Sequence, residues 1–118
     1  MATPNACGTA ALLVEYFVRL STGSYPRASS LKGLLIHTAD DRGNAGPDYQ
    51  YGWGLVNVKA AGDVLTTYDA APGNSHLIES RLTTAAPART HTFTWDGLSP
   101  IRATLVWTDP AGTATTTH

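Results

Sequence analysis

The first twenty residues constrain the fold of this chain more than any other stretch. From residue 5 to residue 20 nearly every position is small or apolar, and the strongly polar side chains are Asn5, Thr9, Glu15 and Arg19. A helix that is apolar almost all round belongs in the interior of a domain. The pattern therefore predicts a buried helix over about 3–20.

Local signals support this predicted helix. Pro4 fits the first helical turn, where its missing N–H costs little, and Gly23 suits a left-handed C-terminal cap. Glu15 and Arg19 form an i,i+4 pair in the favourable orientation. Gly8 costs roughly 0.5–1 kcal/mol relative to alanine in a helix interior, so we expect a neighbour packed closely against it.

Two more helices are expected. A stripe of leucines predicts a helix over about 29–39, with Ser29 or Ser30 as its N-cap. Asn57 is placed to cap a third helix over about 58–67. Residues 40–50 are rich in Gly, Asn, Asp and Pro and are expected to form a loop.

A turn and a short strand are expected between the second and third helices. Gly52 and Gly54 flank Trp53, so the backbone there is free to turn sharply and to approach another segment closely. Leu55 and Val56 have the character of a short buried strand.

The pattern changes beyond residues 68–75, which have the composition of a linker. Residues 76–85 alternate loosely between apolar and polar, and residues 89–95 and 101–107 alternate clearly, as strands do. We expect the opening of an antiparallel β-sandwich or jelly-roll, left incomplete because two or three strands do not bury both faces. The tail 110–118 is expected to be disordered.

Composition excludes several classes of function. The chain has 118 residues, a net charge of −1 and 14% charged residues, where about a quarter is typical of a soluble domain. The balance gives no case for nucleic-acid binding, and no apolar run reaches the roughly 18–20 residues of a membrane span. The single cysteine, Cys7, rules out an internal disulfide and is expected to be a packed small hydrophobe.

Three motifs carry a family resemblance. The first motif is Met1-Ala2-Thr3-Pro4, at the start of a helix of small residues. The second is Leu31-Lys32 together with Thr38-Ala39, in the second predicted helix. The third is Gly52-Trp53-Gly54, which precedes an apolar pair and the third predicted helix. Together, over residues 1–66, they resemble subtilisin-like serine peptidases (peptidase family S8). The part that includes Phe93 and Leu105 to Pro110 resembles the β-domain that follows the catalytic domain in some members.

The resemblance implies a fold and a domain division. The chain would be an α/β fragment, the last helices of a doubly wound subtilisin-like domain, followed by antiparallel strands of an incomplete β-sandwich. Residues 1–67 would be the C-terminal portion of the catalytic domain, 68–75 the linker and 76–118 the start of the β-domain. The chain would thus be cut at both ends.

The resemblance also implies where the chemistry lies. In the family the nucleophilic serine directly precedes the Met-Ala-Thr-Pro motif and follows the triad's Asp and His in the chain. Here all three would lie upstream of Met1, so the chain holds no catalytic residue and is expected to be inactive alone. Met1, Ala2, Thr3 and Pro4 would stand beside the active site as the motif remnant.

The histidines and acidic residues are further candidates for a site. His37 is explained by its place near a helix C-terminus, and none of His37, His76, His91 and His118 has the spacing of an independent triad. A single Cys with scattered His argues against zinc. No cofactor is expected. Calcium at the carboxylates of residues 40–48 stays open for the parent enzyme, although the spacing is not that of an EF-hand.

The same resemblance implies partners and a location. The full-length enzyme would act on protein or peptide substrates outside the cytoplasm, with no nucleic acid or membrane as partner, and this chain would self-associate through uncovered apolar surface. A small non-catalytic binding protein built on a subtilase scaffold is the alternative. A carbohydrate-binding face at Trp95 and Trp107 is a weaker one, because these side chains are expected in a core.

Overall fold

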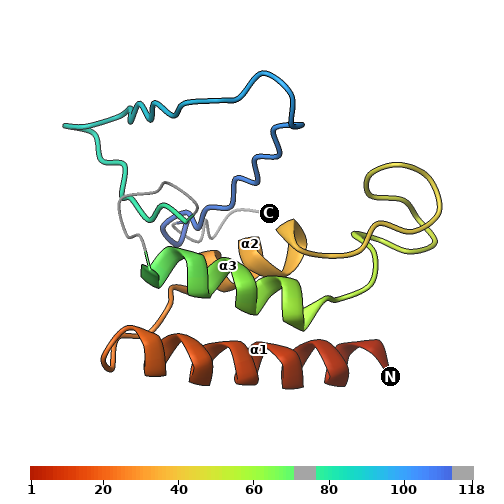
Figure 1. Ribbon diagram of the computed structural model, residues 1–118. Coiled ribbons are helices and arrows are strands. Elements are labelled where there is room, and N and C mark those ends of the chain that lie inside the picture. The colour runs from red at the N-terminus through yellow and green to blue at the C-terminus, as the bar shows by residue number, and fades with distance from the viewer. Residues whose placement is uncertain (71–76, 113–118) are drawn as a thin grey trace, which may run out of the picture.

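The computed structural model describes residues 1–70 and 77–112, and in these ranges it contains three α-helices (Figure 1). They are α1 (Ala2–Leu20), α2 (Ala28–His37) and α3 (Val58–Ala70). The three helices that the sequence predicts are thus confirmed, with ends that differ by no more than three residues. None of the described helices is long and apolar enough to cross a membrane.

α1 ends in a well-formed cap. The Gly23 N–H donates to the carbonyl oxygen of Val18 at 3.0 Å, and Thr22 and Gly23 both have positive φ, of 53° and 97°. This is the bond of a Schellman motif, in which a left-handed residue lets the chain turn back onto the last helical carbonyls. Gly23 therefore takes part in the cap as expected, but Thr22 supplies the first left-handed position.

The core is small and is shared by all three helices. Leu13 of α1, Leu34 of α2 and Ala61 and Leu65 of α3 are buried together. The ring of Phe17 stacks on that of Tyr68 with centroids 6.5 Å apart. Tyr16 and Thr66 share a hydrogen bond of 2.8 Å between their hydroxyl groups, so α1 and α3 are also joined at their polar edge.

The all-round burial that the apolar pattern predicts for α1 does not occur in this chain, where much of the apolar surface of the helix is uncovered. Leu13 is the single buried residue of the helix, and Leu12 beside it is 60% exposed. α2 and α3 both contact α1 and cover one stripe of it, as Figure 1 shows for α1 lying beneath the other two. A cylinder covered along one stripe leaves the rest of its apolar surface in water. Gly8 likewise has open space where a Cβ would point.

The N-cap residue of α3 makes a side-chain capping bond, whereas that of α2 does not. Asn57 caps α3 as predicted, since its Oδ1 accepts a hydrogen bond of 2.9 Å from the Ala60 N–H. The N-cap of α2 is Arg27, and its side chain makes no capping bond, so the prediction of Ser29 or Ser30 as the N-cap is wrong. A distant residue, described below, serves the start of α2 instead.

The chain between α2 and α3 folds back on itself. Asp40 and Leu55 form an isolated antiparallel pair with backbone bonds of 2.8 and 2.9 Å. Gly54, at φ 105°, lies so close to the Asp40 carbonyl that a Cβ would collide with it. The predicted close approach at this glycine is confirmed. The predicted burial of the Leu55–Val56 strand is wrong, because Leu55 is 57% exposed.

The expectation of an antiparallel β-sandwich is also wrong. Residues 77–112, called the C-terminal segment below, contain no strand, and their one pair of bridged residues is Thr83 with Ala86. The segment forms an arc beside the helices in Figure 1. Alternation makes a strand only where a second layer covers its apolar face. Here no layer does, because Phe93, Trp95 and Trp107 are 60%, 54% and 68% exposed.

Some expectations fall partly beyond the described residues. Residues 68–70 of the predicted linker form the last part of α3, while 71–75 and the strand start at His76 lie outside the described residues. Residues 110–112 have no regular secondary structure, and the remainder of the predicted disordered tail, 113–118 with His118, also lies outside.

Candidate functional site

The motif remnant lies at the N-terminal end of α1. Met1 is the N-cap and makes no side-chain capping bond, and the first turn contains no acidic residue. The side chain of Met1 is fully exposed, and Ala2, Thr3 and Pro4 are exposed as well. The structure therefore presents all four motif residues to solvent at one end of a helix.

The backbone gives this end of α1 its chemistry. The first N–H groups of a helix have no partner within it and carry partial positive charge. Pro4 has no N–H, so the donors of the first turn belong to the residues before it. Such an end favours a nearby negative charge, including one that develops on a substrate oxygen.

The described histidines, His37 and His91, do not form a catalytic group with the residues Met1 to Pro4. His37, at the end of α2, has its Nδ1 3.0 Å from the hydroxyl oxygen of Thr104, and the Arg102 Nη1 donates to the His37 carbonyl oxygen at 3.2 Å. Partial burial, and then the nearby Arg102 charge, lower the pKa of His37 below its ordinary 6.5. His91 is exposed. No carboxylate is among the hydrogen-bond partners of either histidine in the described ranges.

The acidic loop between α2 and α3 uses its carboxylates within the loop. Asp48 accepts hydrogen bonds from the N–H groups of Asn44, Gln50 and Tyr51 at 2.7 to 3.1 Å. The bonds from Tyr51 and Asn44 contribute most to holding the pKa of Asp48 below its ordinary value. Asp41 accepts from the Gly46 N–H at 2.7 Å. In residues 1–70 and 77–112 no group of three His, Cys, Asp or Glu is arranged to hold a metal ion.

Cys7, Trp95 and Trp107 are exposed, so the prediction that they are packed in a core is wrong. Cys7 is exposed rather than packed, because the stripe of α1 that meets the other helices runs through Leu13. Trp95 and Trp107 are exposed rather than core. Trp95 donates its indole N–H to the Ser99 carbonyl oxygen at 2.6 Å within its own turn.

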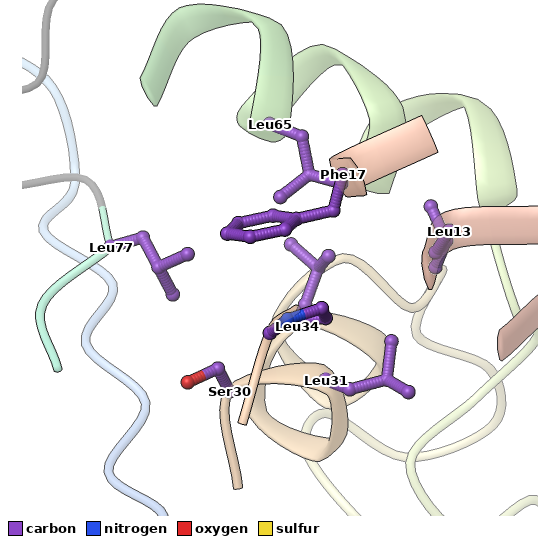
Figure 2. A pocket seen from close by; sticks show the side chains of 8 residues that line it. Leu13, Phe17, Ser30, Leu31, Leu34, Leu65 and Leu77 are labelled. Carbon is purple, nitrogen blue, oxygen red and sulfur yellow. The ribbon is translucent and has the colours of Figure 1, made fainter. Parts of the chain in front are cut away.

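An apolar cavity lies where the three helices meet the C-terminal segment (Figure 2). Its free volume is about 10 Å³, which is near the minimum that one water molecule needs. It is therefore a packing gap and not a ligand site. The side chains that line it are Leu13, Phe17, Pro26, Ser30, Leu31, Leu34, Leu65 and Leu77.

Glu79 is a structural residue that sequence reasoning missed. Its carboxylate accepts a hydrogen bond from the Arg27 N–H at 3.3 Å, pairs with the Arg27 Nε at 3.2 Å and accepts from the Ser30 hydroxyl. It thus supplies the negative charge that the start of α2 lacks. No local signal reveals this role, because the partners lie about fifty positions apart.

Comparison with known proteins agrees with the motif. Residues 1–54, which span α1, α2 and the loop through Gly54, match the subtilase family. This part of the chain therefore belongs to the subtilase family of serine peptidases, as its sequence motifs predict. No solved structure gives a significant match.

Two curated relatives carry serine protease names. The chain is 33% identical over 106 residues to the serine protease/ABC transporter B family protein tagA of Dictyostelium discoideum, which covers 85% of this chain and 6% of that protein. It is 38% identical over 61 residues to the extracellular serine protease of Serratia marcescens, covering 52% and 5%. The chain thus spans a small fraction of the length of these relatives.

Proposed function

We propose that this chain is part of a subtilisin-like serine endopeptidase, whose Asp, His and Ser triad lies upstream of Met1. The observation that carries the proposal is the subtilase match over residues 1–54, combined with the exposed position of Met1 to Pro4 at the start of α1. Residues 1–67 are the C-terminal portion of the catalytic domain in this proposal.

The role of α1 in that enzyme is to aim the nucleophile. A serine that directly precedes Met1 would sit at the N-terminal end of the helix, where the exposed N–H groups of the first turn favour negative charge. During peptide hydrolysis negative charge develops on the carbonyl oxygen of the substrate. The helix end supplies a fixed electrostatic environment for that step, and the core around Leu13 holds the helix rigid.

The chain alone is not expected to hydrolyse peptide bonds. A serine nucleophile needs a base within hydrogen-bond reach and a group that orients the base. The ring of His37 is bonded to Thr104 and faces Arg102, and a cation beside an imidazole disfavours the imidazolium that catalysis requires.

The test of inactivity uses the purified chain, casein and a fluorophosphonate probe. We expect casein cleavage and labelling equal to those of a mock purification from the same host, while subtilisin at the same molarity cleaves and labels. Probe covalently attached to a serine of this chain, located by mass spectrometry, would overturn the inactivity.

The coding sequence before the Met1 codon tests the assignment to a protease separately. The proposal expects in-frame codons for Gly-Thr-Ser directly upstream, preceded further upstream by the Asp and His motifs. An in-frame stop codon in their place would refute it and favour a small non-catalytic binding protein on a subtilase scaffold.

The site of action and the substrate class follow from the same proposal. One relative is named an extracellular serine protease, and this supports secretion of the full-length protein. Its substrates are proteins or peptides, as for serine endopeptidases in general.

A further inference from the structure

The C-terminal segment touches α2 near its end through a compact set of contacts. Val106 is half-buried against Gly33, where a Cβ on the glycine would lie 3.4 Å from a Val106 methyl. One turn further along α2, the His37 Nδ1 meets the Thr104 hydroxyl at 3.0 Å. Arg102 donates to the His37 carbonyl oxygen at 3.2 Å. Residues 101–106 are otherwise exposed, so these contacts hold them on the helix.

The charges around His37 are unbalanced. Arg102 faces it from the C-terminal segment, Lys32 lies five positions earlier on α2, and Asp40 follows three positions later. The Asp40 carboxylate accepts a bond of 3.1 Å from the Asn57 side chain. No ion pair joins His37 to a carboxylate in the described parts of the chain.

We propose that His37 with Thr104 and Arg102 forms a pH-sensitive latch, which holds residues 101–106 on α2 at neutral pH and releases them when the imidazole is protonated. The neutral ring shares a hydrogen bond with Thr104 beside a guanidinium group. Protonation places a second positive charge next to Arg102, and among the described residues no carboxylate is paired with His37 to compensate for it.

The direction of the pH dependence follows by linkage. Burial, and then Arg102, hold the pKa of His37 below its ordinary 6.5 in the folded chain. The contribution of neutral His37 to closure is therefore fully present above that value. Its contribution is lost as the pH falls below 6.5 through the lowered pKa, because the released state binds the additional proton more tightly.

Two introduced thiols report on the closed latch. A Cβ built on Gly33 lies 3.9 Å from the Cβ of Val106, which is within the range that a disulfide requires. The variant Gly33→Cys/Val106→Cys is made in a Cys7→Ser background. With the protein at submicromolar concentration, a dipyridyl disulfide oxidises the two thiols to one disulfide and is itself reduced to two thiopyridines.

The matched comparison is the same double-cysteine chain with His37→Gln, which cannot titrate but keeps polar groups near Thr104. The ratio of the two closure rates cancels the pH dependence of the thiols themselves. We expect a ratio near 1 at about pH 8 and a closure rate at least about threefold lower with His37 than with Gln at about pH 5. His91→Gln, in the same segment, should leave the pH response unchanged.

A further variant separates a latch from a merely structural histidine. Arg102→Gln should make the loss of closure between about pH 8 and about pH 5 smaller, because protonated His37 then meets no neighbouring positive charge in the closed state. Circular dichroism at both pH values should show intact helices. A ratio that does not change with pH, loss of the helices together with the contact, or a pH response in Arg102→Gln as large as that with Arg102 would each contradict the latch.

Discussion

Glu79 and Arg102 bind opposite ends of α2, although both belong to a segment without helix or strand. Glu79 accepts from the Arg27 N–H at the start of the helix, and Arg102 donates to the His37 carbonyl oxygen at its end. Both charges have the sign that suits the helix dipole. The C-terminal segment therefore completes a ten-residue helix that is too short to be stable by itself.

The first prediction concerns this capping. Glu79→Gln removes the charge that serves both the Arg27 N–H and the Arg27 side chain, so the free energy of unfolding should fall by about 1 kcal/mol. Urea denaturation followed by circular dichroism measures it. The control is Glu15→Gln, which removes an exposed pair with Arg19 and should cost no more than about 0.5 kcal/mol. Equal losses in the two variants would contradict the capping role.

A second prediction compares adjacent leucines of α1. Leu13 is 3% exposed and Leu12 is 60% exposed. Leu13→Ala should cost about 2–4 kcal/mol of unfolding free energy, since it opens a cavity among all three helices. Leu12→Ala should change it by no more than about 0.5 kcal/mol. Similar costs would mean that α1 is packed on both faces, against the structure described above.

A third prediction contrasts two glycines. Gly8→Ala should raise the free energy of unfolding by about 0.5–1 kcal/mol, because a Cβ there meets open space and alanine favours the helix. Gly54→Ala should lower it by more than about 1 kcal/mol, since φ is 105° and the Cβ would strike the Asp40 carbonyl. Urea denaturation followed by circular dichroism measures both. A change of the same sign in the two variants would contradict these environments.

A fourth prediction is self-association. Leu12, Leu105 and Trp107 are 60%, 83% and 68% exposed, and surface of this kind drives association when it is contiguous. Light scattering should show oligomers whose mass rises with concentration. The double variant Leu12→Gln/Leu105→Gln should shift the distribution toward monomer. A wild-type chain that stays monomeric at high concentration would disprove the expectation.

The helices were predictable because their signals are local. Asn57 caps the residues directly after it, and the leucines of α2 define a face within three turns. The cap of α1 shows the limit of this reasoning. Gly23 correctly predicts where the helix ends. The left-handed conformation of Thr22 follows from the hydrogen bond between Gly23 and Val18 and not from the residue type of Thr22.

The remaining features depend on residues far apart in sequence. Alternation in residues 101–107 predicted a strand, but a strand needs a covering layer that the described chain lacks. The burial of α1 and Cys7 was inferred from composition, which says how apolar a helix is and not how much surface is present to cover it. The role of Glu79 at Arg27 cannot be predicted from local sequence, because the two residues lie about fifty positions apart. The motif Met1 to Pro4 was identifiable because it is contiguous.

The most direct measurement of the central claim is the position of a fluorophosphonate adduct in the full-length protein, mapped by peptide mass spectrometry. If α1 presents the nucleophile of a subtilisin-like peptidase, the adduct will lie on a serine immediately before Met1, and its replacement by alanine will abolish casein hydrolysis. An adduct on a serine within residues 1–118, or casein hydrolysis that persists after the replacement, would contradict the account.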